Sequence, residues 1–386
     1  MEGRLSRLTQ GVNRIRKESP KFFGRFRDYS FAAARGVIAP CLKHLRIVDQ
    51  RDYDSRSAIM SKLVTIYGGS GFVGRYIARR LAAEGWRVRV AVRRPNEAMF
   101  VKTYGVVGQV EPVLCNIRDD ASVALAMQDT DAVVNCVGVL NALGKNDFGS
   151  VQAEGAERVA RMAAENGVSR MVHLSAIGAD AESDSEYART KAHGEAGVLR
   201  YMPDAVILRP SVIFGTEDQF FNRFAAMTRM GPFLPLFGSD TRFQPVYVDD
   251  VARAAVQGVL GTVGGGVYEL GGPEVQTFRD LMQKMLGVIH RRRIIIGMPF
   301  WAARIMAGVL DIVKFVSFQL FPNHILTRDQ VKNLRRDNVV ADGAKGFAEL
   351  GIEPATLDSV LPEYLWKYRP SGQYDDIQNS AENLRN

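Results

Sequence analysis

A glycine-rich turn between an apolar run and a helical pattern constrains this chain more than any other feature. Residues 62–74 read KLVTIYGGSGFVG, and residues 76–83 continue with helical spacing. β-Branched residues followed by closely spaced glycines predict a strand, a tight turn and a helix. Glycine at residues 68, 71 and 74 would give the turn the φ freedom it needs, let a pyrophosphate approach the backbone closely and let the helix pack on the strand. Because a second strand is predicted over residues 87–92, the pattern favours a dinucleotide site over a purely structural turn.

The end of that second strand bears on which dinucleotide is bound. An NAD site usually carries Asp or Glu there, which holds the ribose 2′-OH. Here the strand ends in Arg93 and Arg94, and no carboxylate follows before Glu97. Guanidinium groups suit a 2′-phosphate, so the sequence favours NADPH over NAD(H). The alternative that one or both arginines simply point to solvent stays open, and Arg93 is the stronger candidate.

Strands and helices keep alternating after this unit. Further strands are predicted over residues 110–114, 132–137, 170–174 and 205–208, and helices over residues 119–127, 151–166, 220–230, 277–286, 347–350 and 357–366. The stretch GPFLPLFG at residues 231–238 is predicted to be a loop. Repeated strand and helix units predict an α/β fold, a Rossmann-type doubly wound parallel sheet with its ligand at the carboxyl ends of the strands.

The positive charge is confined to one end of the sequence. The chain carries a net charge of +8, and residues 1–59 hold 13 Lys and Arg against 6 Asp and Glu, or +7. Nucleic acid is therefore not a predicted partner. Three interpretations of residues 1–59 stay open. The segment is an organellar presequence, or a basic arm that docks on a partner or an anionic membrane, or a poorly ordered stretch before a true start at Met60. Three further parts are predicted: an NAD(P)-binding Rossmann domain at residues 60–215, a smaller C-terminal lobe interleaved with it at residues 216–370, and a tail at residues 371–386.

Cysteine spacing and hydropathy argue against two other classes of protein. Cys41, Cys115 and Cys136 show no CxxC spacing and no neighbouring histidine cluster, so neither a metal site nor a disulfide framework is predicted. No uncharged apolar run reaches the roughly 18 residues that a membrane-spanning helix needs. We therefore predict no transmembrane helix.

A tyrosine and a lysine four residues apart supply possible chemistry. Tyr187 and Lys191 lie in the stretch YARTK, just after the fifth predicted strand, and share one face of a helix. A nearby ammonium would stabilise the phenolate, so the tyrosine could act as a general acid or base. The alternative is a solvated helix start without a catalytic role.

Several motifs together resemble a known superfamily. GGSGFVG, Arg93, NCVGV, YARTK, LRPSVIFG and QPVYVDDVA resemble the short-chain dehydrogenase/reductase superfamily in its extended or atypical branch. The stretches IFGTEDQFFNRF, RFQPVYVDDVARA and ILTRDQV more narrowly resemble the nucleotide-binding accessory subunit of respiratory complex I. The resemblance covers about residues 62–323.

The resemblance implies a set of cofactor contacts. The glycines would hold the pyrophosphate, Arg93 the 2′-phosphate, and Asn116 would replace an adenine-contacting Asp. Tyr187 and Lys191 would lie near the nicotinamide ribose. The implied cofactor-binding residues are Gly68, Ser70, Gly71, Phe72, Val73, Gly74, Arg93, Arg94, Asn116, Ile117, Val137, Gly138, Tyr187, Lys191, Pro210, Ser211 and Val212.

One departure from the family pattern bears on catalysis. Extended members place a substrate-orienting Ser or Thr where this chain has Ile177, two residues after Ser175. Ser175 could substitute only if the backbone shifted, and Ser183 or Ser185 only if their loop folded inward. Loss of that hydroxyl would cost on the order of 10- to 1000-fold in rate.

Three functions follow from these observations. The first is an NADPH-binding, largely non-catalytic accessory or assembly subunit of NADH:ubiquinone oxidoreductase (complex I). The second is a free NADP-dependent reductase, epimerase or dehydratase, with Tyr187 as acid or base and Lys191 lowering its pKa. The third is a redox-sensing or scaffold protein that binds NADPH.

A basic and then apolar region bears on partners and location. His290 to Arg293 read HRRR, and the helix predicted over residues 300–321 has only Arg304, Asp311 and Lys314 as charges. That helix is either buried between lobes or interfacial, with the arginines near lipid phosphates. The predicted partners are complex I subunits, with a peripheral membrane or quinone-proximal contact through residues 290–321. The expected location is the cytoplasmic side of a bacterial inner membrane, or the matrix side of the mitochondrial inner membrane if residues 1–59 are a presequence.

Overall fold

The computed structural model describes residues 62–139, 147–299, 301, 328–370 and 372–374. The predictions for residues 1–59, for the helix at 300–321 and for nearly all of the tail at 371–386 lie outside the described residues.

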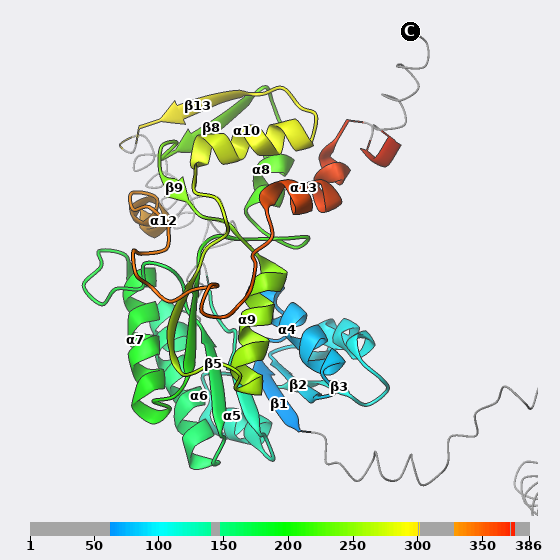
Figure 1. Ribbon diagram of the computed structural model, residues 1–386, viewed down its shortest axis with the longest axis vertical. Coiled ribbons are helices and arrows are strands. Elements are labelled where there is room, and N and C mark those ends of the chain that lie inside the picture. Colours follow the sequence, from blue (N-terminus) through cyan, green and yellow to red (C-terminus); the bar gives the residue numbers. More distant parts are fainter. Residues whose placement is uncertain (1–61, 140–146, 300, 302–327, 371, 375–386) are drawn as a thin grey trace, which may run out of the picture. The chain divides into compact units, whose positions relative to one another are not determined.

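A seven-stranded parallel sheet forms the centre of the fold (Figure 1). Its strands are β1 (Leu63–Tyr67), β2 (Arg87–Val92), β3 (Val110–Leu114), β4 (Ala132–Asn135), β5 (Arg170–Leu174), β6 (Val206–Pro210) and β11 (Gly266–Leu270). Their order is β11-β6-β5-β4-β1-β2-β3. The chain direction across the sheet reverses between β1 and β4, the position at which doubly wound sheets bind ligands. The predicted Rossmann-type α/β fold is confirmed.

Helices cover both faces of this sheet because side chains alternate along each strand. Ile66 lies in the core beneath α4 (Phe72–Ala83) and α9 (Val248–Leu260). Its neighbour Tyr67 lies in the opposite core, beneath α5 (Asp120–Met127) and α6 (Glu154–Glu165). The helix α7 (Glu186–Tyr201) packs along α6. A one-turn π-helix, η3 (Gly149–Ala153), precedes α6, and the 3-10 segment η2 (Pro95–Tyr104) follows β2.

A third core belongs to the C-terminal half of the chain and contains buried Phe, Leu and Met side chains. Its helices are α8 (Phe221–Met227), α10 (Phe278–Val288) and α13 (Leu357–Leu365). Three two-stranded sheets accompany them: β7 (Ile213–Phe214) with β10 (Val246–Tyr247), β9 (Arg242–Phe243) with β12 (Gln276–Thr277), and β8 (Phe233–Phe237) with β13 (Ile294–Met298). Short helical segments are α12 (Arg328–Asn333), η4 (Trp366–Tyr368) and η5 (Gly372–Tyr374).

Two local predictions were wrong. The stretch predicted as a loop at residues 231–238 contains β8, which pairs in parallel with β13 from Phe233 opposite Ile294 to Phe237 opposite Met298. The pairing partner lies about 60 residues away in sequence, so no local pattern reveals it. Residues 347–350, predicted as helical, form turns. Among the helices that the structure describes, none has the length and apolarity to cross a membrane.

Candidate functional site

The three glycines after β1 have different structural roles. Gly68 has φ of +77°, and a Cβ there would lie 3.2 Å from the Val137 side chain. A Cβ on Gly74 would lie 2.5 Å from the Gly68 carbonyl oxygen, so this glycine lets α4 pack against the turn. A Cβ on Gly71 would meet only that same oxygen, at 3.1 Å. Gly71 therefore borders open space at the start of α4, where helix N–H groups favour phosphate.

A cavity of about 250 Å³ opens at the carboxyl ends of β1, β2 and β4, and we call it the strand-end cavity. It is lined by Tyr67, Gly68, Ser70, Gly71, Ala91, Val92, Arg93, Cys115, Asn116, Ile117, Cys136, Val137, Gly138, Val139 and Val151. Eight of the residues implied by the resemblance are in this lining. The implied residues outside it are Phe72, Val73, Gly74, Arg94, Tyr187, Lys191, Pro210, Ser211 and Val212.

The two arginines after β2 are in different environments. Arg93 lines the strand-end cavity, and its side chain forms no hydrogen bond or ion pair with a described residue. Arg94 is paired with Glu97 at 3.0 Å and is outside the cavity lining. The lining contains no carboxylate, so Arg93 carries its only formal charge. Arg93 is therefore the cationic group that this cavity lining offers to an anionic ligand.

Asn116 is held by its own turn. Its backbone N–H donates to the Ser122 hydroxyl at 2.9 Å, and its side-chain oxygen accepts from the Arg118 N–H at 3.2 Å. The side-chain NH₂ then keeps its donors for the cavity. An ionised Asp at this position could only accept a hydrogen bond from a bound adenine, whereas the Asn116 amide can donate one.

Gln152 is a positioning residue that the sequence did not reveal. It lies in η3, is 2% exposed, and its amide donates to the Val139 carbonyl at 2.5 Å. Its side-chain oxygen accepts from the Thr190 hydroxyl on α7 at 3.2 Å. Gln152 thereby fixes the cavity wall after β4 relative to the helix that carries Tyr187. The strand-end residues Tyr67, Ala91 and Cys136 were also missed, although any residue ending a parallel strand is a candidate.

Lys191 is buried beside the cavity. Its Nζ donates to the Leu174 carbonyl at 3.0 Å, and a Cβ on Gly138 would lie 3.4 Å from that nitrogen. Burial lowers the pKa of Lys191 to about 8, an effect that the charges of Glu195 and Cys136 oppose.

Tyr187 lies one helical turn before Lys191, with its ring edge-on to Phe148 at 6.0 Å between centroids. Burial raises the pKa of Tyr187 to about 12. Burial is the cause of this rise. The idea that Lys191 lowers the pKa of Tyr187 stays a prediction. Its hydroxyl forms no hydrogen bond with a described residue.

A buried histidine lies below this region. The Nδ1 atom of His173, on β5, lies 3.2 Å from the side-chain nitrogen of Asn135 and forms a hydrogen bond with it. The Nε2 atom of His173 has no hydrogen-bond partner among the described atoms. Burial and the charge of Lys191 lower the pKa of His173 to about 3. Asn135 also accepts from the Val137 N–H at 3.1 Å, so the neutral pair supports the cavity wall.

The hydroxyl that could replace the one missing at residue 177 is already engaged. The Ser175 hydroxyl donates to the buried carboxylate of Glu195, which also accepts two hydrogen bonds from Arg209, at 2.9 and 2.6 Å. The Ile177 N–H donates to the Pro210 carbonyl at 3.1 Å, which fixes the backbone at the position where the resemblance predicts a hydroxyl.

The two other candidate serines also serve the backbone. Ser185 caps α7 by accepting from the Ala188 N–H at 3.4 Å, and its hydroxyl donates to Asp329 at 2.8 Å. Ser183 accepts from the Ser185 N–H at 3.3 Å. Both hydroxyls therefore accept hydrogen bonds from backbone N–H groups at the start of α7.

Comparisons with known proteins agree with this geometry. Residues 64–271 match the model of the NAD dependent epimerase/dehydratase family. The NADH dehydrogenase (ubiquinone) 1 alpha subcomplex subunit 9, mitochondrial, of Arabidopsis thaliana is 35% identical over 323 residues, 82% of this chain and 80% of that protein. The NADH-ubiquinone oxidoreductase 40 kDa subunit, mitochondrial, of Neurospora crassa is 31% identical over 326 residues, 84% of each chain.

A solved structure shows the same fold. The dTDP-glucose 4,6-dehydratase DesIV of Streptomyces venezuelae, with NAD and TYD bound, superposes with a TM-score of 0.61 at 20% identity. The match covers 82% of this chain and 99% of the dehydratase. The family match spans more than half of the sequence and includes the glycine turn and the strand-end cavity. The chain is thus a member of the NAD-dependent epimerase/dehydratase family.

Proposed function

We propose that this chain is an NADPH-binding accessory subunit of NADH:ubiquinone oxidoreductase that holds its cofactor without turning it over. The carrying observation is the use of Ser175 in the buried Glu195–Arg209 cluster, together with Ile177 at the position of the missing hydroxyl. With Ser175 engaged in this way, no hydroxyl is available from it to orient a reacting carbonyl. Tyr187 is a weak proton donor at neutral pH because burial raises its pKa. The names and long alignments of the two mitochondrial relatives support the complex I assignment.

The choice of NADPH rests on Arg93. This guanidinium has no described partner and borders a cavity without carboxylates. Gly71, with open space at the start of α4, would let the pyrophosphate approach the helix N–H groups. Residues 60–215 would carry the cofactor, and residues 216–370 would carry the contacts with the complex.

The attachment would be peripheral, through residues 290–321. Two locations fit the proposal, the cytoplasmic side of a bacterial inner membrane and the matrix side of the mitochondrial one. The free reductase or epimerase is disfavoured because the Lys191 ammonium is bonded to a backbone carbonyl and the pKa of Tyr187 is raised.

Solubilisation of native membranes in mild detergent tests the proposal. The complexes are separated on a native gel, the band with NADH dehydrogenase activity is identified by mass spectrometry, and its nucleotides are extracted. We expect this chain in that band with NADPH retained. Recovery only as a free protein that releases NADP(H) readily would overturn the subunit assignment and make a substrate screen the next step.

A further inference from the structure

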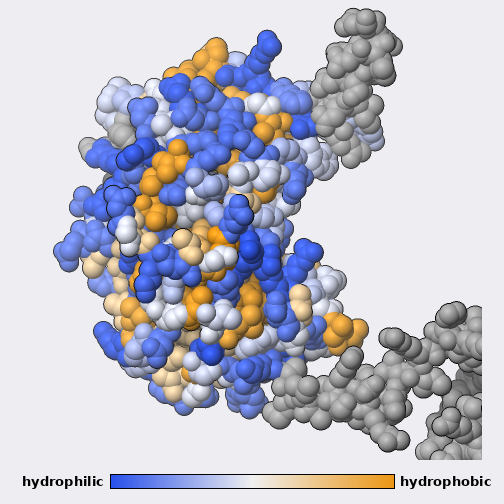
Figure 2. Space-filling model, viewed as in Figure 1, coloured by the Kyte–Doolittle hydropathy of each residue, from blue (hydrophilic) through white to orange (hydrophobic). Residues whose placement is uncertain are grey.

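The two-stranded sheet of β8 and β13 exposes an apolar face. Side chains alternate along β8, so Leu234 and Leu236 are buried while Phe233 is 56% exposed. Ile294 is opposite Phe233 in the register and is 61% exposed, and Ile296 is 42% exposed. Figure 2 shows hydrophobic surface at the top of the view, where Figure 1 places these strands. We call Phe233, Pro235, Ile294 and Ile296 the ribbon face.

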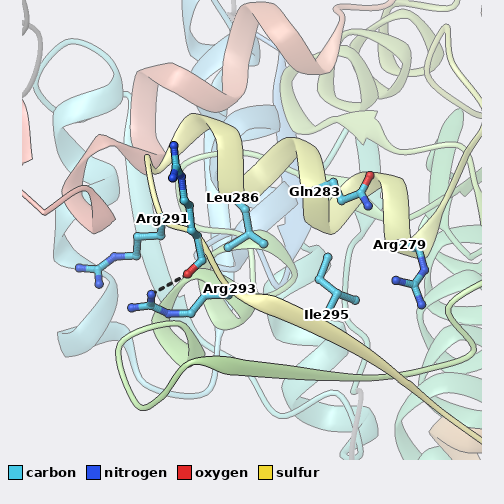
Figure 3. A pocket seen from close by; sticks show the side chains of 7 residues that line it. Arg279, Gln283, Leu286, Arg291, Arg293 and Ile295 are labelled. Atoms are coloured by element: carbon cyan, nitrogen blue, oxygen red, sulfur yellow. Dashed lines mark hydrogen bonds between the residues drawn. The ribbon is translucent and has the colours of Figure 1, made fainter.

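A groove lined by arginines lies between α10 and β13, next to this ribbon. Its volume is about 320 Å³. Figure 3 shows Arg279 at one end of the groove and Arg291 and Arg293 at the other, with Leu286 of α10 and Ile295 of β13 between them. Arg292 completes the set. We call these four side chains the arginine groove.

Two of the four guanidinium groups of the arginine groove are held by backbone carbonyls, and none of the four is paired with a described carboxylate. Arg291 donates to the Tyr368 carbonyl at 2.8 Å, and Arg293 donates to the Thr228 carbonyl at 2.9 Å. None of the four arginines forms an ion pair with a described residue, and the groove lining contains no carboxylate. Partial burial and the nearby charges of Arg293 and Arg229 lower the pKa of Arg291. An anion in the groove would relieve this repulsion.

These features match the two chemical halves of an anionic lipid. Phosphate suits guanidinium groups, and exposed Phe and Ile suit the acyl region just below the headgroups. A free phosphate would use the groove and leave the ribbon face unpartnered. The chain after β13 is also poor in charge, with three charged residues between positions 300 and 321. We infer that the ribbon face and the arginine groove dock on the surface of an anionic phospholipid bilayer, with the arginines at lipid phosphates.

This inference deepens the peripheral attachment proposed above, because it names the residues and the chemistry that would make the contact. Each Arg near an anionic surface contributes about 1 kcal/mol, or about fivefold in affinity. Arg279 and Arg292 donate no side-chain hydrogen bond to a described residue, so removing their charges breaks none of the described hydrogen bonds. The double variant Arg279→Gln/Arg292→Gln should therefore bind anionic vesicles about 25-fold more weakly.

The experiment is co-sedimentation of the full purified chain with vesicles of phosphatidylcholine alone or mixed with phosphatidylglycerol. A matched control, Arg79→Gln/Arg87→Gln, removes two exposed arginines from the cofactor-binding half. We expect binding only to the mixed vesicles, loss in the groove variant, and wild-type binding in the control. Ile294→Thr/Ile296→Thr should also weaken binding, while keeping β-branched residues in the strand.

Three results would overturn the inference. The first is wild-type chain that stays free of mixed vesicles. The second is equal binding by the groove and control variants, which would assign the binding to general charge such as that of residues 1–59. Inorganic phosphate could raise the thermal unfolding temperature of the wild type but not of Arg279→Gln/Arg292→Gln, without any vesicle binding, which would indicate a free-phosphate site. NADPH affinity and recovery with complex I are measured separately on the same proteins, so failure of the docking surface is distinguishable from failure of the proposed function.

Discussion

Replacement of Arg93 tests the cofactor assignment most directly. A hydrogen bond to a charged group contributes about 1.5–3 kcal/mol, and the exposure of Arg93 favours the lower part of that range because solvent screens the pair. Arg93→Gln should therefore weaken NADPH binding by about 10- to 30-fold, which corresponds to about 1.5–2 kcal/mol. NADH lacks the 2′-phosphate, so its dissociation constant should change by less than about twofold.

Isothermal titration calorimetry with NADPH and NADH measures both constants on each variant. Arg94→Gln is the matched control, because Arg94 is already paired with Glu97 and lies outside the cavity lining. Arg93→Asp should go further and favour NADH, since a carboxylate accepts from the 2′-OH and repels the 2′-phosphate. Equal losses for NADPH and NADH in Arg93→Gln, or an equal loss of NADPH in Arg94→Gln, would refute the reasoning.

Three more outcomes are expected. Gly71→Val should abolish cofactor retention, measured by nucleotide extraction, while the chain stays folded. Gly74→Ala should instead lower stability, since its Cβ would lie 2.5 Å from the Gly68 oxygen. If Gly71→Val retained the cofactor, the glycine turn would not be the pyrophosphate site. Because burial lowers the pKa of Lys191 to about 8, the unfolded chain binds more protons above that pH. Urea titrations should show wild-type stability rising between pH 8 and 10 by about 2 kcal/mol relative to Lys191→Met, and parallel pH profiles would contradict a buried ammonium. Ser175→Ala should lower the free energy of unfolding by about 1–3 kcal/mol without changing NADPH affinity, and a large affinity loss would return Ser175 to the cofactor site.

The central sheet could be predicted from sequence because each strand is followed by its own local signals. The strands at residues 87–92, 110–114 and 170–174 have the predicted bounds. The helix predicted from residue 119 has Asp119 as its N-cap, accepting from the Ser122 N–H at 2.9 Å. Capping and β-branched runs act over a few residues, so one window of sequence contains them.

The features that could not be predicted depend on residues far apart in sequence. Pairing of β8 with β13 joins segments about 60 residues apart. The proline in the middle of FLPLF is a residue that usually indicates a loop rather than a strand, so the local sequence predicts a loop there. Glu195 follows Ser175 by 20 positions, and nothing in YARTKAHGE indicates that this glutamate accepts the serine's hydrogen bond. The candidate catalytic serine was visible in the sequence, while the group that engages it was not.

The segment around α12 forms hydrogen bonds with the part of the predicted site that would lie near the nicotinamide. Asp329 accepts from the Ser185 hydroxyl and from the N–H groups of Glu186 and Tyr187, so its charge lies at the positive N-terminus of α7.

Nine residues later, Asn338 accepts from the Ser211 hydroxyl at 2.6 Å and from the Val212 N–H at 3.1 Å. One short piece of chain therefore ties the helix of Tyr187 to the loop after β6. An enzyme that exchanges substrate and cofactor needs these elements to open, whereas a subunit that keeps its cofactor gains from holding them together. The bonds of Asp329 and Asn338 thus agree with the proposal, made above from Ser175, that the subunit retains its cofactor.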